Sequence, residues 1–144
     1  MPKTIIFPAL AALAALGAWL LVSYVLQSDT GEEDGVTSLL VQTSEELNRR
    51  LPDMVDENTV LEATSGSNTF FSYFYTLLNY SIDDVDVDAF VKRMQPELVK
   101  GVCGSIKLQE FLDLGVSIRH VYSDKDRIEF TSISITPADC TSTD

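Results

Sequence analysis

The longest run of apolar positions lies near the N-terminus. Residues 5–26 read IIFPALAALAALGAWLLVSYVL and carry no charge. As a helix they would extend about 33 Å, enough to cross the roughly 30 Å of a bilayer's hydrocarbon core. Lys3 precedes this run, and four acidic residues follow within residues 29–34. The positive-inside rule therefore predicts that residues 1–4 are cytoplasmic, that residues 5–26 form a transmembrane signal-anchor, and that the remaining chain lies outside.

A cleaved signal peptide is the alternative interpretation of the same run. Ala15-Leu16-Gly17 offers a small-x-small cleavage site. Signal peptides have an apolar core of about 7–15 residues, and this run is longer, so we favour the uncleaved anchor. Both interpretations place the outer part in the same compartment. The small-residue pairs Ala11/Ala15 and Ala14/Ala18 would also fit a homodimer formed through this helix.

The pattern after the membrane segment predicts alternating helices and hairpins. Residues 27–35 are polar and acidic, which is typical of a flexible linker, and the outer domain then covers residues 36–144. A helical stripe begins at Val36 and ends before Pro52. Residues 59–65 and 69–80 predict strands joined by a turn at 66–68. Residues 116–123 and 127–136 predict a second hairpin around a turn at 123–126.

Two further helices are expected between the hairpins. The first begins after Asp86, a suitable N-cap, and its apolar stripe reaches Val102. Pro96 lies inside this stretch and should kink the helix or split it. The second helix runs from Ser105 to Leu114 and stops at Gly115. The order α-β-β-α-α-β-β predicts an α+β fold in which helices pack on a four-stranded antiparallel sheet.

The aromatic strand at residues 69–80 has two apolar faces. We expect the second and third helices to cover one face and the first helix to pack on the other. The functional alternative is that this strand lines a partly open face and binds a partner, because open apolar patches in soluble domains often mark interaction sites. The candidate partner-binding residues are Phe71, Tyr73 and Tyr75.

Charge narrows the classes of partner. The formal net charge is −12, and without Lys3 the outer part has 9 basic and 22 acidic residues, or −13. Such a surface repels phosphate, so nucleic acids and anionic lipid headgroups are poor candidates. A basic protein partner remains compatible with this charge.

The two cysteines predict a structural cross-link. Cys103 and Cys140 are the only cysteines in the chain, and two cysteines in an exported domain are typically disulfide-bonded. A disulfide that closes the loop from Cys103 to Cys140 would stabilise the domain by roughly 4 kcal/mol in the chain-entropy model. A redox-active pair is the alternative, but the CxxC spacing that would favour it is missing.

Catalytic and metal-binding patterns are weak. His120 is the only histidine, and it shares a predicted strand face with apolar residues. A hydrolase using His120 would need a nucleophile and an acid nearby, which the sequence does not reveal. Residues 84–88 read DVDVD, the opening of a calcium loop, but Ala89 and Gln95 stand where Gly and Glu are required. We therefore predict no catalytic residue, no metal site and no cofactor.

Several short motifs resemble an uncharacterised family of small exported or membrane-anchored bacterial domains. The resemblance covers about residues 38–140. The matching segments are Leu51-Pro52-x-Met54-Val55-Asp56, Tyr73-x-Tyr75-Thr76-Leu77-x-Asn79-Tyr80, Cys103, Gly115-Val116 with Tyr122, and Pro137-Ala138-Asp139-Cys140. The resemblance implies a location in the bacterial envelope and supports the disulfide. It carries over no catalytic residue.

These observations favour a non-enzymatic interaction module. It would be a single-pass protein of the inner membrane, with its domain in the periplasm and another envelope protein as its partner. An immunity or inhibitor protein for a basic toxin or hydrolase is the second hypothesis. A small hydrolase using His120 is the third, and a carrier of a small ligand is the fourth.

Overall fold

The computed structural model describes residues 30–141, with side chains from residue 34 onward. The chain divides into two compact units, residues 1–35 and residues 36–144, and the β-sheet belongs entirely to the second. The expected transmembrane segment, residues 5–26, lies outside the described residues. Within the described part, no helix combines the length and the apolar character needed to span a membrane.

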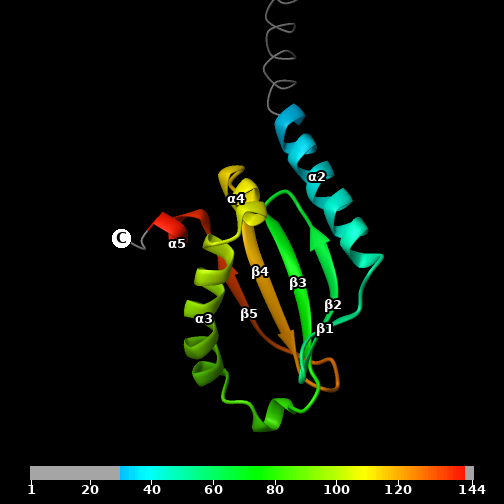
Figure 1. The fold of residues 1–144 in the computed structure, drawn as a ribbon, viewed down its shortest axis with the longest axis vertical. Coiled ribbons are helices and arrows are strands. Elements are labelled where there is room, and N and C mark those ends of the chain that lie inside the picture. The colour runs from blue at the N-terminus through cyan, green and yellow to red at the C-terminus, as the bar shows by residue number, and fades with distance from the viewer. Residues whose placement is uncertain (1–29, 142–144) are drawn as a thin grey trace, which may run out of the picture. The chain divides into compact units, whose positions relative to one another are not determined.

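A five-stranded mixed sheet forms the centre of the domain (Figure 1). Its strands follow the chain order from one edge to the other. Neighbouring strands are antiparallel except β3 and β4, which are parallel. The strands are β1 (Asp53–Asp56), β2 (Thr59–Gly66), β3 (Phe70–Leu77), β4 (Ser117–Ser123) and β5 (Glu129–Ile135).

The expected α+β class and both hairpins are confirmed, but the prediction of four strands is wrong, because the sheet has five. The additional strand, β1, pairs with β2 at the sheet edge, and its four residues are all exposed. Its sequence, DMVD, has no buried face and little strand propensity. Pairing with β2 therefore defines this strand, and pairing is not visible in a local pattern.

The prediction that all strands are antiparallel is also wrong. The connection from β3 to β4 contains a 3-10 turn, η1 (Ile82–Asp84), and the helices α3 (Val87–Cys103) and α4 (Ile106–Asp113). These helices return the chain to the end of the sheet where β3 began, so β4 runs parallel to it. The two hairpins are thus joined by the parallel pairing of β3 with β4. The alternation of apolar and polar residues within a strand does not reveal the direction of the neighbouring strand.

The helix boundaries between the hairpins agree with the sequence signals. Asp86 caps α3, because its Oδ1 accepts a hydrogen bond of 3.0 Å from the Ala89 N–H. Ser105 caps α4 in the same way, and Gly115 follows it with φ of 79°. Pro96 does not split α3, which continues as one helix around it. A short helix, α5 (Pro137–Thr141), ends the described chain and was not expected.

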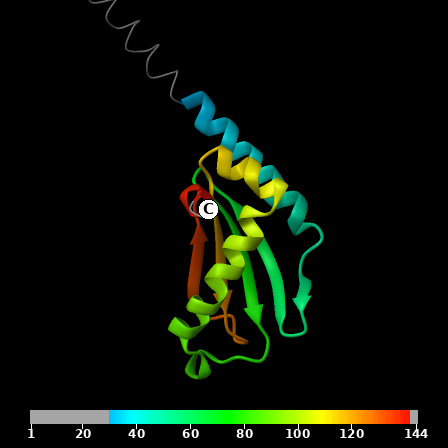
Figure 2. The same cartoon turned by 60° about the vertical axis from the view of Figure 1, so that its left-hand side comes forward.

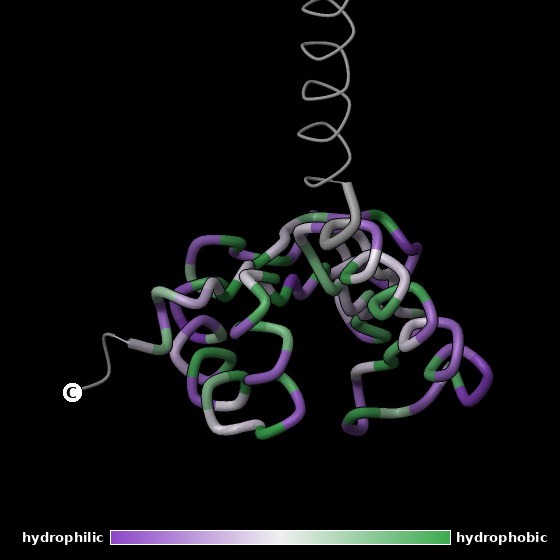
Figure 3. The backbone as a smooth tube through the Cα atoms, turned by 90° about the horizontal axis from the view of Figure 1, so that it is seen from above, coloured by the Kyte–Doolittle hydropathy of each residue, from purple (hydrophilic) through white to green (hydrophobic). Residues whose placement is uncertain are grey.

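The helices α2 (Thr30–Asn48), α3 and α4 all cover the same face of the sheet (Figures 1 and 2). The expectation that the first helix packs on the opposite face is wrong. The fully buried Leu40 of α2 belongs to one apolar core with Phe71, Val102 and Phe111. Along the backbone, hydrophobic and hydrophilic segments alternate (Figure 3), as expected for elements buried on one side.

Close backbone approach and a side-chain clamp hold α2 on β2. A Cβ placed on Gly66 would lie 2.3 Å from the Leu40 carbonyl carbon, so only glycine allows this contact. At the C-terminal end of α2, the Asn48 side chain donates to the Thr64 carbonyl and accepts from the Thr64 N–H, at 2.9 and 2.7 Å. The helix itself begins at Thr30, within the segment for which the sequence predicts a flexible linker.

A buried carboxylate organises the end of the sheet opposite α4. Asp124, in the turn between β4 and β5, is 0% exposed. It accepts hydrogen bonds of 2.9 to 3.0 Å from the backbone N–H groups of Ile128, Ile82 and Asp126. These bonds, led by that from Ile128, lower the pKa of Asp124. The carboxylate therefore ties the predicted turn at 123–126 to η1.

Candidate partner-binding groove

A groove of about 500 Å³ lies where α2 and α4 flank the start of β3. Each helix turns one apolar stripe toward the sheet, and β3 supplies the floor between them. The lining residues are Leu39, Thr43, Glu46, Leu47, Arg50, Phe71, Tyr73, Lys107, Leu108, Glu110 and Phe111.

The floor of the groove is aromatic and firmly packed. The ring of Phe71 is 0% exposed and lies 5.2 Å from that of Phe111 and 5.3 Å from that of Tyr73, between centroids. Leu39 stands at the rim and remains 45% exposed. A rigid aromatic floor below an exposed aliphatic rim is typical of the anchor pockets of protein interfaces.

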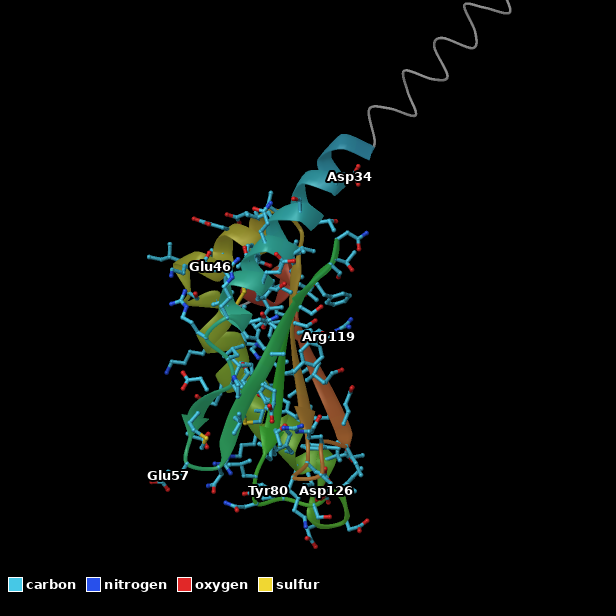
Figure 4. The ribbon with its side chains drawn as sticks, turned by 90° about the vertical axis from the view of Figure 1, so that its right-hand side faces the viewer. Asp34, Glu46, Glu57, Tyr80, Arg119 and Asp126 are labelled. Carbon is cyan, nitrogen blue, oxygen red and sulfur yellow. A yellow bond between two sulfur atoms is a disulfide. The ribbon has the colours of Figure 1, made fainter. Side chains whose placement is uncertain are left out.

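The rim carries both signs of charge. Glu46 of α2 forms an ion pair of 3.7 Å with Arg50, which lies just beyond the end of that helix, and Glu46 is labelled on α2 in Figure 4. On α4, the opposite wall, Lys107 and Glu110 line the groove. The groove therefore presents alternating charges around an apolar centre, in contrast to the strongly acidic chain as a whole.

Aromatic rings continue from the groove floor along the sheet. The parallel register sets Tyr73 beside His120 and Tyr75 beside Tyr122. The rings stack with centroid distances of 5.5 Å for Tyr73 and His120, 5.8 Å for Tyr75 and His120, and 5.1 Å for Tyr75 and Tyr122. Burial raises the pKa of Tyr122 to about 12 and raises the pKa values of both other tyrosines. All three phenols therefore stay neutral at physiological pH.

His120 lies inside this stack rather than in an accessible site. It is 6% exposed, its Nδ1 is 3.3 Å from the Tyr75 hydroxyl, and its buried Nε2 has no hydrogen-bond partner among the described residues. Burial lowers the pKa of His120 to about 4. The ring is therefore neutral at pH 7 and is shielded from any substrate, which does not support a role as the base of a hydrolase.

The candidate metal loop has a structural explanation. In residues 84–88, Asp86 serves as the cap of α3, and Asp88 lies in its first turn, where a carboxylate is favourable. Among the described residues, no group of three or more His, Cys, Asp or Glu side chains converges as a metal site would require.

The structure separates the residues predicted to bind a partner. Phe71 and Tyr73 line the groove, whereas Tyr75 lies farther along β3 and outside its lining. Sequence patterning did not distinguish the groove residues of α2 and α4, among them Leu39, Leu108 and Phe111, from core residues. Their apolar periodicity was visible, but it is the same for a core position and for a groove wall. Only the spacing between the two helices distinguishes them.

Together these features define a class of protein: a small disulfide-bonded α+β domain whose mixed sheet is covered by helices on one face, with a groove between two of them. The sulfur atoms of Cys103 and Cys140 are bonded, as the sequence predicts, and the bond joins the end of α3 to α5.

Solved structures of bacterial proteins share this fold. A Pseudomonas aeruginosa protein described as a candidate secreted protein matches with a TM-score of 0.65 and 12% identity, covering 77% of this chain and 97% of its own. The pilotin EpsS of the Vibrio vulnificus type 2 secretion system matches with a TM-score of 0.61 and 14% identity, over 76% and 94% of the two chains.

The pilotin AspS of the Vibrio cholerae type II secretion system matches with a TM-score of 0.58 and 12% identity, over 76% of this chain and 95% of its own. No family model matches the sequence, and no curated protein matches it. At these identities the comparisons establish a shared fold.

Proposed function

We propose that this chain is a non-enzymatic protein-binding module of the bacterial envelope. Residues 5–26 hold it in the inner membrane, residues 36–144 lie in the periplasm, and the groove between α2 and α4 binds an apolar segment of another envelope protein. The observation that carries the proposal is the groove itself, with its rigid aromatic floor and exposed Leu39 at the rim.

The shape and chemistry of the groove favour a helical segment as its occupant. Two helices with an apolar floor between them form the kind of site that accepts the apolar face of an amphipathic helix. The rim offers Arg50 and Lys107 to acidic side chains, and Glu46 and Glu110 to basic ones. An amphipathic helix with mixed charges along its edges would satisfy both.

Three further observations support an envelope location. The apolar run at residues 5–26 fits an anchor, and the disulfide fits an oxidising compartment. The fold is shared with two pilotins of type II secretion systems and with a protein described as secreted, which fits an exported protein.

The test compares two aspartate substitutions on equally exposed leucines. Leu39, 45% exposed, lines the groove, whereas Leu114, 50% exposed, does not. The full chain in non-ionic detergent serves as bait in envelope extracts, and the recovered protein is then purified and titrated against the native chain, Leu39→Asp and Leu114→Asp. Placing a charge in the apolar groove should weaken binding at least tenfold, a loss of about 1.4 kcal/mol.

Leu114→Asp should bind as the native chain does, within about twofold. Equal affinity of the native chain and Leu39→Asp would remove the groove as the binding site. Failure to recover any protein that binds saturably would contradict the proposed function as a whole.

A further inference from the structure

A second hollow lies on the outer side of α3, beside the disulfide. Its volume is about 760 Å³, and it shares no lining residue with the groove between α2 and α4. The helices α3 and α5 are neighbours here (Figure 1), held together by the Cys103–Cys140 bond. The hollow is lined by Lys92, Gln95, Pro96, Val99, Lys100, Cys103, Gly104 and Cys140.

The floor of this hollow is apolar, and its charge is entirely positive. Pro96, Val99 and the disulfide supply carbon and sulfur surface between two exposed ammonium groups, those of Lys92 and Lys100. No acidic residue lines the hollow. Among the described residues, neither lysine forms an ion pair with a carboxylate of this chain. Two ammonium groups therefore flank an apolar strip, although the chain as a whole has a net charge of −12.

The spacing along α3 defines what could pair with this surface. Lys92 and Lys100 are eight positions apart, which is about 12 Å along a helix, and Pro96 lies midway between them. In an extended peptide, residues i and i+4 are about 13 Å apart, and residues i, i+2 and i+4 point to the same side. Two carboxylates at i and i+4 would thus meet the two lysines while an apolar side chain at i+2 meets Pro96.

We propose that the hollow beside the disulfide binds an extended acidic segment of a partner protein, with the pattern acidic-x-apolar-x-acidic. Charge complementarity selects this occupant. The acidic surface elsewhere on the chain repels such a segment, so the segment binds only at the hollow. At physiological ionic strength, salt screens charges over about 8 Å, so distant acidic residues have little effect on contacts in the hollow. This site is independent of the groove between α2 and α4.

The experiment uses a defined probe, the fluorescein-labelled peptide Glu-Ser-Leu-Ser-Glu-Ser-Leu-Ser-Glu. Its binding to the full chain in non-ionic detergent is followed by fluorescence anisotropy at physiological ionic strength. A peptide with Gln in place of every Glu serves as the ligand control. The test variant is Lys92→Glu with Lys100→Glu, and the matched control is Arg49→Glu with Lys125→Glu, which changes the net charge equally at exposed positions outside the hollow.

The native chain should bind the acidic peptide saturably, and the Lys92/Lys100 variant should bind it at least tenfold more weakly. The Arg49/Lys125 control should stay within about twofold of the native chain. Circular dichroism confirms that all variants are folded. The inference is overturned if the acidic peptide does not bind saturably, if the Gln peptide binds equally well, or if both variants weaken binding to the same extent.

Discussion

At the scale of single residues, the register between β3 and β4 explains the chemistry of the one histidine. Tyr73 and Tyr75 alternate along β3, and His120 and Tyr122 alternate along β4, so a parallel pairing places all four rings on one face. The imidazole is enclosed by two tyrosine rings, and within the described part of the chain its polar contact is the Tyr75 hydroxyl. Its environment therefore disfavours the protonated form, as desolvation does for any buried base.

Stability should consequently depend on the protonation of His120. Burial lowers its pKa from 6.5 to about 4, so between these two pH values the unfolded chain binds a proton that the folded chain does not. The free energy of unfolding is therefore highest above pH 6.5 and falls as the pH is lowered toward 4, by about 3 kcal/mol from this group. Urea denaturation of the full chain at several pH values measures this loss.

The His120→Phe variant is the control for this pH effect. It keeps an aromatic ring in the stack and removes the titrating group, so its stability should change much less over the same range. Asp124 and Asp139 also have lowered pKa values, but hydrogen bonds to them are lost only as the pH falls below their normal value of 3.8. An unchanged acid sensitivity in His120→Phe would show that another group is responsible.

At the scale of elements, the position of α2 depends on its close approach to β2. The helix backbone touches β2 at Gly66, and the Asn48–Thr64 pair fixes the end of the helix. Because α2 forms one wall of the groove, these contacts also determine the width of the groove. The same face holds α3 and α4, whereas the opposite face carries Arg119 stacked on the Phe70 ring at 3.6 Å.

Gly66→Ala should therefore destabilise the domain, by about 1–3 kcal/mol, because the added Cβ would overlap the Leu40 backbone and force α2 away from β2. Gly101→Ala is the matched control. A Cβ at Gly101, within α3, meets nothing within 4 Å, and alanine is favoured over glycine in a helix by about 0.5–1 kcal/mol.

Thermal and urea unfolding of the two variants should thus shift in opposite directions. If Gly66→Ala were as stable as Gly101→Ala, the contact between α2 and β2 would be looser than the structure shows.

At the scale of the whole molecule, charge and the proposed membrane anchor would act together. The outer part carries a net charge of −13, which keeps it away from anionic surfaces, and the anchor would hold it close to a membrane all the same. This combination restricts binding to partners that offer a specific surface. Both proposed sites carry basic side chains, Arg50 and Lys107 in the groove and Lys92 and Lys100 in the hollow.

The anchor predicts a specific behaviour on fractionation. The full chain should remain with membranes in alkaline carbonate and leave them only in detergent, because residues 5–26 would be embedded in hydrocarbon. Protease added to spheroplasts should remove residues 36–144 while leaving cytoplasmic proteins intact. A carbonate-soluble chain whose new N-terminus is Ala18 would instead establish cleavage after Gly17 and contradict the anchor.

The sequence alone determined most of the secondary structure and both hairpins. Amphipathic periodicity, caps such as Asp86 and Ser105, and the turn at 123–126 are local signals, and the local chain obeys them in the structure. The sequence also predicted the pairing of Cys103 with Cys140, because the chain has no other cysteine. The aromatic strand pointed to Phe71 and Tyr73, which do line the groove.

Only the tertiary structure decided how these elements combine. The strand β1, the parallel pairing of β3 with β4 and the shared face of the three helices depend on contacts between residues far apart in the chain. The groove and the hollow likewise depend on how segments that are far apart in the chain pack beside one another. Apolar periodicity predicts that a side chain will be buried, but it does not predict which element will cover it. A groove remains where the neighbouring element lies too far away to fill the space.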